Sequence, residues 1–292
     1  IEEDTNVPVF VKEVMKPMVR LEGDKLPVSA FTPDGTFPVG TTQYEKRGIA
    51  ISIPVWEPET CIQCNQCAFV CPHAAIRPYL IKSDAKQGAP AGFKTKAAIG
   101  KEFSGYDFRI QVSPLDCTGC GNCVDICPAK EKPMKMVLLE EVAQAEIENY
   151  KFAEAQPIPD IAINADTVKG SQFRKPLFEF SGACAGCGET PYVKLISQLF
   201  GDRMVVANAT GCSSIYGGSA PSNPYTVNEK GHGPAWANSL FEDNAEFGYG
   251  MNLAFTQRRE KLADLIKKAL ESAISADLKA AFNEWLEGKD DA

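Results

Sequence analysis

Two copies of one cysteine pattern constrain this chain more than any other feature. Each copy reads C-x2-C-x2-C-x3-C and is followed by a proline, over residues 61–71 and 117–127. In two-cluster ferredoxins three closely spaced thiolates of such a run bind one [4Fe–4S] cluster, and the fourth binds the other cluster. The repeat therefore predicts two clusters with exchanged fourth ligands, one held by Cys61, Cys64, Cys67 and Cys127 and the other by Cys117, Cys120, Cys123 and Cys71.

Zinc and disulfides are the competing interpretations of these eight cysteines. A pair of four-cysteine zinc sites needs neither a third cysteine at this spacing nor a following proline. Disulfides are typical of exported proteins, whereas the opening Ile-Glu-Glu-Asp lacks the basic and apolar regions of a signal peptide. We therefore favour iron–sulfur clusters, with His73 as a solvated neighbour. Gly119 and Gly121 either direct backbone amides at cluster sulfurs or only permit tight turns.

The other three cysteines lie downstream in two short motifs. Cys184 and Cys187 belong to Gly-Ala-Cys-Ala-Gly-Cys-Gly, and Cys212 belongs to Thr-Gly-Cys-Ser-Ser. Three cubanes require one thiolate more than the eleven cysteines of the chain provide. The count favours a third [4Fe–4S] cluster whose fourth ligand lies outside this chain. From spacing alone, a redox pair or buried thiols stay open.

Composition and charge exclude several classes of protein. The 292 residues are 44% hydrophobic, which suits about two globular domains. A net charge of −8 without a Lys/Arg-rich block speaks against nucleic-acid binding. No apolar run approaches the roughly 18 residues of a membrane span, so we expect a cytoplasmic protein without a membrane partner. The chain starts at Ile and stops just after a helical segment, which we interpret as part of a longer polypeptide.

The pattern along the chain predicts four regions. An irregular, proline-rich docking region with short strands, for example at 7–11 and 48–53, comes first. An α+β two-cluster ferredoxin-like domain follows and contains an insertion between the cysteine runs. A helix near 140–155 and a linker lead to the beginning of an α/β domain. The regions are 1–55, 56–140 with the insertion 72–116, 141–175 and 176–292.

Within the last region, helix and strand signals alternate. We predict a helix from Thr190-Pro191 to Gly201, a buried strand over 204–207, a second helix from Pro234 and a helical rhythm from Gln257 through Ile274. Ligands of open α/β sheets bind beyond the carboxyl ends of strands, near helix amino termini. On spacing alone, His232 is better explained as a residue that fixes a turn, and Glu189 as an acidic residue in a first helical turn.

Four stretches make the chain similar to a known family. Tyr44–Ala50, with its Glu-Lys-Arg sequence, precedes the two cysteine runs. Phe180–Pro191, Ala209–Gly217 and the long run Gly231–Gly248 follow them in the expected order. Together they resemble the central-to-late part of pyruvate:ferredoxin oxidoreductase in its long single-chain, homodimeric form. The resemblance implies that the α/β region begins a thiamine-diphosphate-binding domain.

The resemblance also implies roles for individual residues. Cys184, Cys187 and Cys212 would bind a proximal [4Fe–4S] cluster beside thiamine diphosphate. The candidate cofactor-binding residues are Glu189, Gly211, Cys212, Ser213 and His232. The Gly-Asp-Gly motif that holds Mg2+ and the diphosphate is absent from these residues, and no catalytic residue is assigned. This segment alone is therefore not expected to be active.

The activity implied by the resemblance is oxidative decarboxylation of pyruvate with coenzyme A to acetyl-CoA and CO2. Electrons would pass through three clusters to ferredoxin or flavodoxin, and the remainder of the polypeptide would supply the missing parts of the site. Two other readings stay open at this point. One is a non-catalytic two-cluster electron carrier, and the other is an oxidoreductase for another 2-oxoacid, such as 2-oxoglutarate or an aromatic one.

Overall fold

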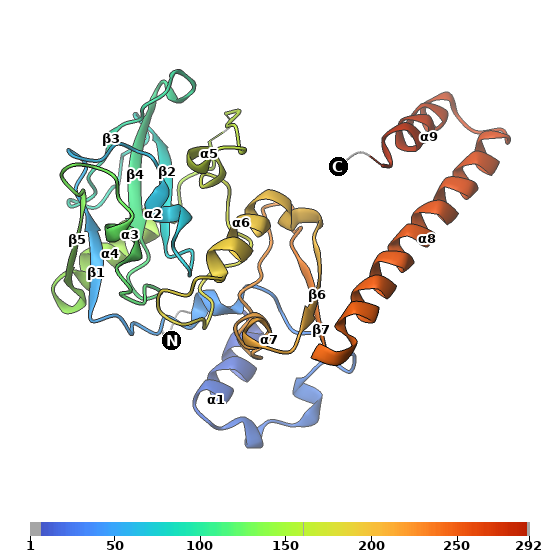
Figure 1. Cartoon of the computed structure of the whole chain (residues 1–292), viewed down its shortest axis with the longest axis horizontal. Coiled ribbons are helices and arrows are strands. Elements are labelled where there is room, and N and C mark those ends of the chain that lie inside the picture. The colour runs from blue at the N-terminus through green and yellow to red at the C-terminus, as the bar shows by residue number, and fades with distance from the viewer. Residues whose placement is uncertain (1–6, 160, 291–292) are drawn as a thin grey trace. The chain divides into compact units, whose positions relative to one another are not determined.

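A computed structural model of the chain describes residues 7–159 and 161–290 (Figure 1). The backbone divides into two compact units. Unit 1 contains the described residues up to Val206 together with Cys212–Trp236. Unit 2 contains Ala207–Gly211 and the described residues from Ala237 onward. Both cysteine runs and all three remaining cysteines belong to unit 1.

The amino-terminal segment is helical where the sequence suggests a strand over 7–11. A π-helical turn, η1 (Val11–Met15), runs into α1 (Lys16–Val19), and three short 3-10 turns follow: η2 (Gly23–Lys25), η3 (Val28–Ala30) and η4 (Thr41–Tyr44). The Pro8 carbonyl accepts hydrogen bonds from the Val11 and Lys12 amides, which starts a helical turn. Buried Val11, Val14 and Met15 then have helical rather than alternating spacing. The strand prediction was therefore wrong here.

The ferredoxin-like part repeats one arrangement twice. Strand β1 (Ser52–Trp56) leads through the first cysteine run and α2 (Gln66–Phe69) to β2 (Ile76–Lys82). Strand β4 (Tyr106–Val112) leads through the second run and α3 (Asn122–Asp125) to β5 (Met134–Leu138). β1 pairs antiparallel with β5, and β2 pairs antiparallel with β4. The internal repeat of the sequence is thus a repeat of the fold.

The insertion between the cysteine runs contributes ordered sheet structure. Ile76 lies opposite Val112 and Lys82 opposite Tyr106, so β2 and β4 pair along their full lengths. Strand β3 (Lys96–Ala97) adds to the other edge of β4, and η5 (Lys101–Phe103) leads into β4. The 3-stranded sheet has the order β2-β4-β3.

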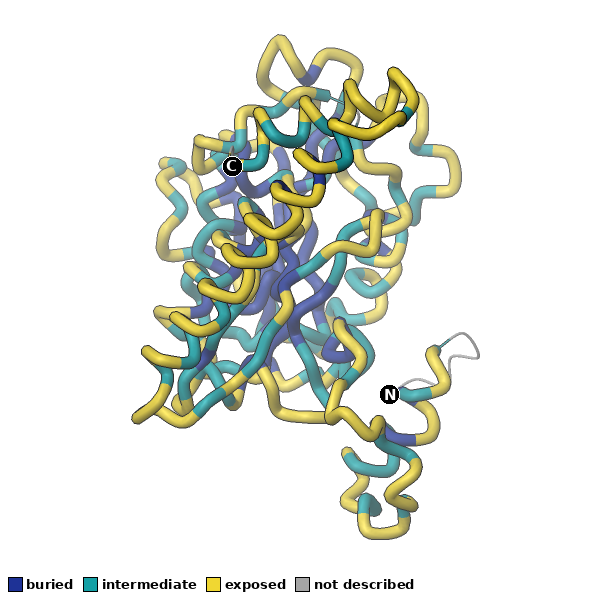
Figure 2. The backbone as a smooth tube through the Cα atoms, turned by 90° about the vertical axis from the view of Figure 1, so that its right-hand side faces the viewer, coloured by how far each residue is buried: buried dark blue, intermediate teal, exposed yellow. Residues whose placement is uncertain are grey.

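One apolar core supports both cysteine runs. Ile53, Phe108 and Met134 are almost completely buried, and Trp56 packs edge-on against Phe108 with 6.1 Å between ring centroids. Cys71, Cys117 and Cys123 belong to the same apolar core. Figure 2 shows this buried backbone in dark blue. Helix α4 (Leu139–Glu154) confirms the predicted helix near 140–155.

The region after 155 matches its predicted elements unevenly. The helix beginning near Thr190 is confirmed, but a strand occupies the place of the helix predicted from Pro234. The Ala235 amide donates to the Met204 carbonyl at 3.0 Å, so this segment extends to pair with its neighbour. The predicted strand over 204–207 lies slightly later and is not fully buried. The helices of unit 1 in this region are α5 (Val168–Ser171), α6 (Thr190–Phe200), η6 (Gly201–Arg203) and α7 (Cys212–Gly218). Strand β6 (Val205–Ala209) pairs with β7 (Ala235–Ser239).

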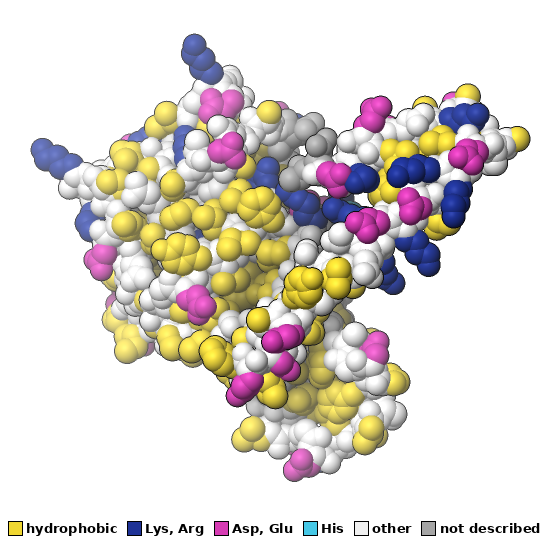
Figure 3. Space-filling view, turned by 45° about the vertical axis from the view of Figure 1, so that its right-hand side comes forward, with side chains coloured by type: hydrophobic (Ala, Val, Ile, Leu, Met, Phe, Trp, Pro, Cys, Tyr) yellow, Lys and Arg dark blue, Asp and Glu magenta, His cyan; other side chains and the backbone are white. Residues whose placement is uncertain are grey.

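Unit 2 is dominated by two helices. After η7 (Phe241–Asp243), α8 (Asn244–Leu270) begins well before the predicted Gln257 and ends before Ile274, and α9 (Ala276–Gly288) follows. Leu262, Leu265 and Ile266 of α8 line an apolar groove with Phe282 and Trp285 of α9. Charged side chains cover much of their surface (Figure 3). No helix among the described residues is long and apolar enough to cross a membrane.

The core account predicts the effect of removing Phe108. Phe108→Ala leaves a cavity between β4 and Trp56, so the free energy of unfolding should fall by about 3–5 kcal/mol in urea denaturation. Val28→Ala is the control, because Val28 is 89% exposed and its loss should change stability by no more than about 0.5 kcal/mol. Equal effects of the two substitutions would contradict the assignment of Phe108 to the core.

Candidate metal centres

Eight thiols converge in two groups. Burial raises the pKa of Cys67, and the thiols of Cys61, Cys64 and Cys127 raise it further. Burial also raises the pKa of Cys117 to about 12 against the opposing hydrogen bond from the Gly119 amide, and Cys71 and Cys120 add to the rise. We call these sets the first thiol group (Cys61, Cys64, Cys67, Cys127) and the second thiol group (Cys71, Cys117, Cys120, Cys123).

The two thiol groups are neighbours. Burial raises the pKa of Cys123, and both Cys71 of its own group and Cys67 of the first group add to that rise. Each group takes three thiols from one cysteine run and its fourth from the other. This grouping of neighbouring thiols supports the exchange of the fourth cysteines, which stays a prediction as a ligand assignment.

A cavity with an empty volume of about 340 Å³ is lined by all four cysteines of the first thiol group. Its walls are apolar and include Trp56, Phe108, Ile110 and Met134. Across the described residues, no three His, Cys, Asp or Glu side chains are arranged to hold a single metal ion. Soft thiolates around an apolar hollow are the donor set of an iron–sulfur cluster, so these residues fit that group.

Equivalent turns shape both cysteine runs. Gln63 and Asn65 of the first run have φ of 57° and 61°, and Gly119 and Gly121 occupy the corresponding positions of the second run with φ of 71° and 80°. The amide of Gln63 lies 3.4 Å from Cys61 Sγ, and the amide of Gly119 lies 3.4 Å from Cys117 Sγ. Left-handed backbone thus accompanies N–H···S hydrogen bonds in each run.

The two non-glycine turns are held by long-range hydrogen bonds. Gln63 donates to the Ala97 carbonyl at 2.7 Å and accepts from the Ile99 amide at 2.8 Å. Asn65 donates to the Lys169 carbonyl at 2.8 Å. These contacts offset the strain of positive φ at residues that have a Cβ. The sequence spacing gave no signal of this support.

The third set of cysteines is only partly assembled. Cys187 precedes α6; burial favours its neutral thiol, but the amides of Thr190 and Glu189 outweigh burial and lower its pKa. Gly186 packs on the second thiol group, since a Cβ there would lie 3.6 Å from Cys120 Cβ. Cys184 and Cys212 are exposed. Cys184, Cys187 and Cys212 do not form a metal-binding group among the described residues.

His73 is buried, which corrects the expectation of a solvated side chain. It is only 2% exposed, and burial lowers its pKa. Its Nδ1 lies 3.1 Å from the Ser181 carbonyl, and its own carbonyl accepts from the Phe180 amide at 2.9 Å. The segment that leads to Cys184 therefore covers His73, a long-range contact that the local sequence does not reveal.

The Glu-Lys-Arg segment connects the same two regions. Lys46 forms an ion pair with Asp116, next to Cys117, and its Nζ lies 4.6 Å from the centre of the Phe180 ring. Arg47 donates to the Ser181 carbonyl at 3.1 Å. Ser222 donates to the Glu45 carboxylate at 2.9 Å. These residues fasten the second cysteine run to the segment 180–184, a role that the sequence alone did not show.

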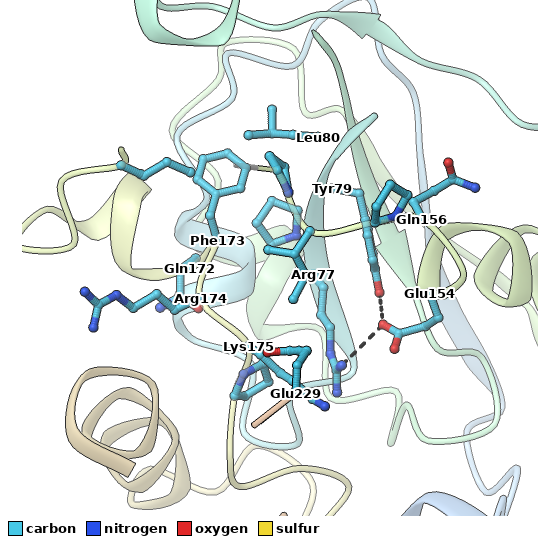
Figure 4. A pocket seen from close by; sticks show the side chains of 16 residues that line it. Arg77, Tyr79, Leu80, Glu154, Gln156, Gln172, Phe173, Arg174, Lys175 and Glu229 are labelled. Atoms are coloured by element: carbon cyan, nitrogen blue, oxygen red, sulfur yellow. Dashed lines mark hydrogen bonds and ion pairs between the residues drawn. The ribbon is translucent and has the colours of Figure 1, made fainter. Parts of the chain in front are cut away.

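The buried cation Arg77 lies beside a larger pocket (Figure 4). Its guanidinium pairs with Glu179 and, at 3.3 Å, with Glu154. Tyr79 donates to the same Glu154 carboxylate, and burial raises the pKa of Tyr79. The pocket has an empty volume of about 880 Å³ and is also lined by Phe173. It contains no cysteine and is separate from the thiol groups.

The candidate cofactor residues are dispersed along exposed loops and helix ends. Glu189 is exposed. Burial raises the pKa of Tyr225 to about 12, and the negative charge of the Glu189 carboxylate makes a smaller contribution to the rise. Gly211 is exposed with room for a side chain, and Ser213 lies half-buried in α7. The exposed His232 donates its backbone amide to Asn228 at 3.0 Å, as in a turn. Their cofactor contacts stay predictions.

The fold and its thiol groups define a two-cluster iron–sulfur protein, and comparisons with known sequences agree. Residues 60–130 match the 4Fe-4S dicluster domain family. Residues 1–50 match EKR, a domain of unknown function. Residues 258–292, expected from the sequence to belong to the α/β domain, match the insertion domain of pyruvate-ferredoxin oxidoreductase.

Individual relatives cover nearly the whole chain. It is 68% identical over 288 residues to pyruvate:ferredoxin oxidoreductase of Moorella thermoacetica, covering 99% of this chain and 25% of that protein. It is 56% identical to pyruvate-flavodoxin oxidoreductase of Klebsiella pneumoniae, and the match covers 98% of this chain and 24% of that protein. Mitochondrial pyruvate dehydrogenase (NADP(+)) of Euglena gracilis is 50% identical, and the match covers 98% of this chain and 16% of that protein. The chain is thus similar in sequence to one segment of the pyruvate:ferredoxin and pyruvate-flavodoxin oxidoreductases and spans about a quarter of their length.

The turn geometry gives a test with a matched control. A Cβ at Gly119 would lie 2.9 Å from the Ser52 carbonyl oxygen, whereas one at Gly88, also at positive φ, meets nothing within 4 Å. Gly88→Ala should lower the free energy of unfolding by about 1–2 kcal/mol from backbone strain alone. Gly119→Ala should lower it by about 2–5 kcal/mol because a clash is added. Equal losses in denaturation experiments would contradict the close approach at Gly119.

Proposed function

We propose that this chain is the electron-transfer and cofactor-binding part of a cytoplasmic, homodimeric pyruvate:ferredoxin or pyruvate:flavodoxin oxidoreductase. The parent enzyme would convert pyruvate and coenzyme A to acetyl-CoA and CO2 and transfer the electrons to ferredoxin or flavodoxin. The observation that carries the proposal is the exchanged grouping of eight thiols, with a cavity enclosed by one group. The names of the relatives support the reaction.

The first and second thiol groups would each hold one [4Fe–4S] cluster. Bound clusters supply reversible one-electron transfer, at potentials that burial and hydrogen bonds to sulfur adjust. Trp56, Phe108 and Ile110 exclude water from the first site. The amides of Gln63 and Gly119 donate toward the first sulfur of each run, which favours thiolate.

The third site would use Cys184, Cys187 and Cys212, with a fourth cysteine supplied by the remainder of the polypeptide. The packing of Gly186 against Cys120 supports a relay that begins at this third site and continues to the second thiol group. The first group, which neighbours the second through Cys67 and Cys123, would then lie toward the external acceptor. These contacts support an order that runs from the third site through the second thiol group to the first.

The remaining cofactors involve residues outside this chain. Glu189, Gly211, Ser213, His232 and the backbone of Cys212 would contact thiamine diphosphate, while the Mg2+ ligands and the pyruvate and coenzyme A sites would lie elsewhere in the parent. Thiamine diphosphate supplies an electron sink for decarboxylation when bound. The exposed Glu189, which interacts with the hydroxyls of Tyr216 and Tyr225, would help to orient it.

The exchanged ligand assignment can be tested by comparing single-cysteine variants of the full-length enzyme. Cys127→Ala should remove the same electron paramagnetic resonance signal as Cys61→Ala, because both cysteines belong to the first thiol group. Cys71→Ala should remove the same signal as Cys117→Ala. Spectra of anaerobically reduced samples make the comparison. The assignment fails if Cys127→Ala instead reproduces the spectrum of Cys117→Ala.

The third site has its own test in the full-length enzyme. Cys212→Ser should reduce the iron content by about four atoms per chain and abolish pyruvate oxidation, while the signals of both ferredoxin-type clusters persist. Iron analysis, spectra and an activity assay provide these three readouts. Retention of three intact clusters in the variant would refute a ligand role for Cys212.

A further inference from the structure

A buried lysine joins α6 to the loop between the two thiol groups. Lys194 is 1% exposed. Its ammonium donates to the carbonyls of Ala68, Phe69 at 3.0 Å and Cys71 at 3.2 Å. These carbonyls terminate α2, which carries Cys67, and continue to Cys71. One side chain therefore binds the backbone that connects a cysteine of the first thiol group to a cysteine of the second.

The Lys194 ammonium has no carboxylate partner among the described residues. Burial lowers the pKa of Lys194 to about 8, and the Cys71 and Cys67 thiols oppose that shift while Arg77 adds to it. Arg77 is a like charge and is already paired with Glu179 and Glu154. A buried ammonium without a compensating negative charge is strongly disfavoured. Among the described residues, the two cysteines, which belong to different thiol groups, are the acidic groups that interact with this ammonium.

We propose that Lys194 is the shared positive counter-charge of the two ferredoxin-type clusters and a positioning residue that holds α6 against them. This inference rests on the proposed function, because it requires clusters at both thiol groups. A cluster bound by four thiolates is negatively charged and becomes more negative when it gains an electron. A fixed cation in a low-dielectric interior favours the reduced state and raises the reduction potential.

The position of Lys194 in α6 extends its effect to the third site. Cys187 lies just ahead of α6, and its loop packs on Cys120 through Gly186. By anchoring α6 to the end of α2, Lys194 fixes the distance between that loop and the second thiol group. The same residue thus has two effects: its charge raises the reduction potentials of two clusters, and its hydrogen bonds position the third site.

Redox titration of the full-length enzyme, followed by electron paramagnetic resonance, tests this role. Lys194→Gln keeps hydrogen-bond donors and removes the charge, and Lys194→Arg keeps the charge. Lys175→Met is the control, since Lys175 is an exposed cation of the same unit. Lys194→Gln should lower the equilibrium constant for reducing at least one ferredoxin-type cluster tenfold or more, which is about 59 mV for one electron. The Lys194→Arg and Lys175→Met variants should stay close to the wild type.

Three results would overturn the proposal. Unchanged potentials in a fully loaded Lys194→Gln variant would show that the charge does not act on the clusters. If Lys194→Gln loses a cluster, Lys194→Arg must retain it, and loss in both variants would reduce Lys194 to a packing role. A wild-type enzyme without the two ferredoxin-type signals would refute the proposed function itself, and this role with it.

Discussion

The structure depends on the exchange of one cysteine between two neighbouring thiol groups. Cys71 ends the first run but joins the second group, and Cys127 does the reverse. Neither site can form from one half of the repeat, so α2 and α3 must come together and both pairs of strands must close around one core. This explains why buried cysteines belong to the same hydrophobic core as Ile53, Phe108 and Met134.

Segments from both sides of the ferredoxin-like part are fastened to the second thiol group. Lys46 pairs with Asp116, His73 contacts the Ser181 carbonyl, and Lys194 binds the carbonyl of Cys71. Each contact uses a buried or half-buried polar group next to a cysteine run. Such contacts hold the segments on both sides of the loop of Cys184 and Cys187 against the ferredoxin-like part.

The sequence predicts what local spacing determines. Three thiols of each group lie within one cysteine run, and the Thr190-Pro191 start and apolar periodicity of α6 are also local, because these features depend on residues a few positions apart. Features that depend on distant partners were missed. The strand at Ala235–Ser239 forms because β6 is available, and His73 is buried because residues 180–184 cover it. Gln63 and Asn65 adopt positive φ only with support from residues 34 and 104 positions away.

The central claim is that this chain carries two complete cluster sites and most of a third. An anaerobic count of iron and acid-labile sulfide in the full-length enzyme tests it most directly. The account predicts about twelve irons and about twelve sulfides per chain, as three cubanes require. About eight of each would leave Cys184, Cys187 and Cys212 without a cluster, and zinc without labile sulfide would contradict the iron–sulfur assignment altogether.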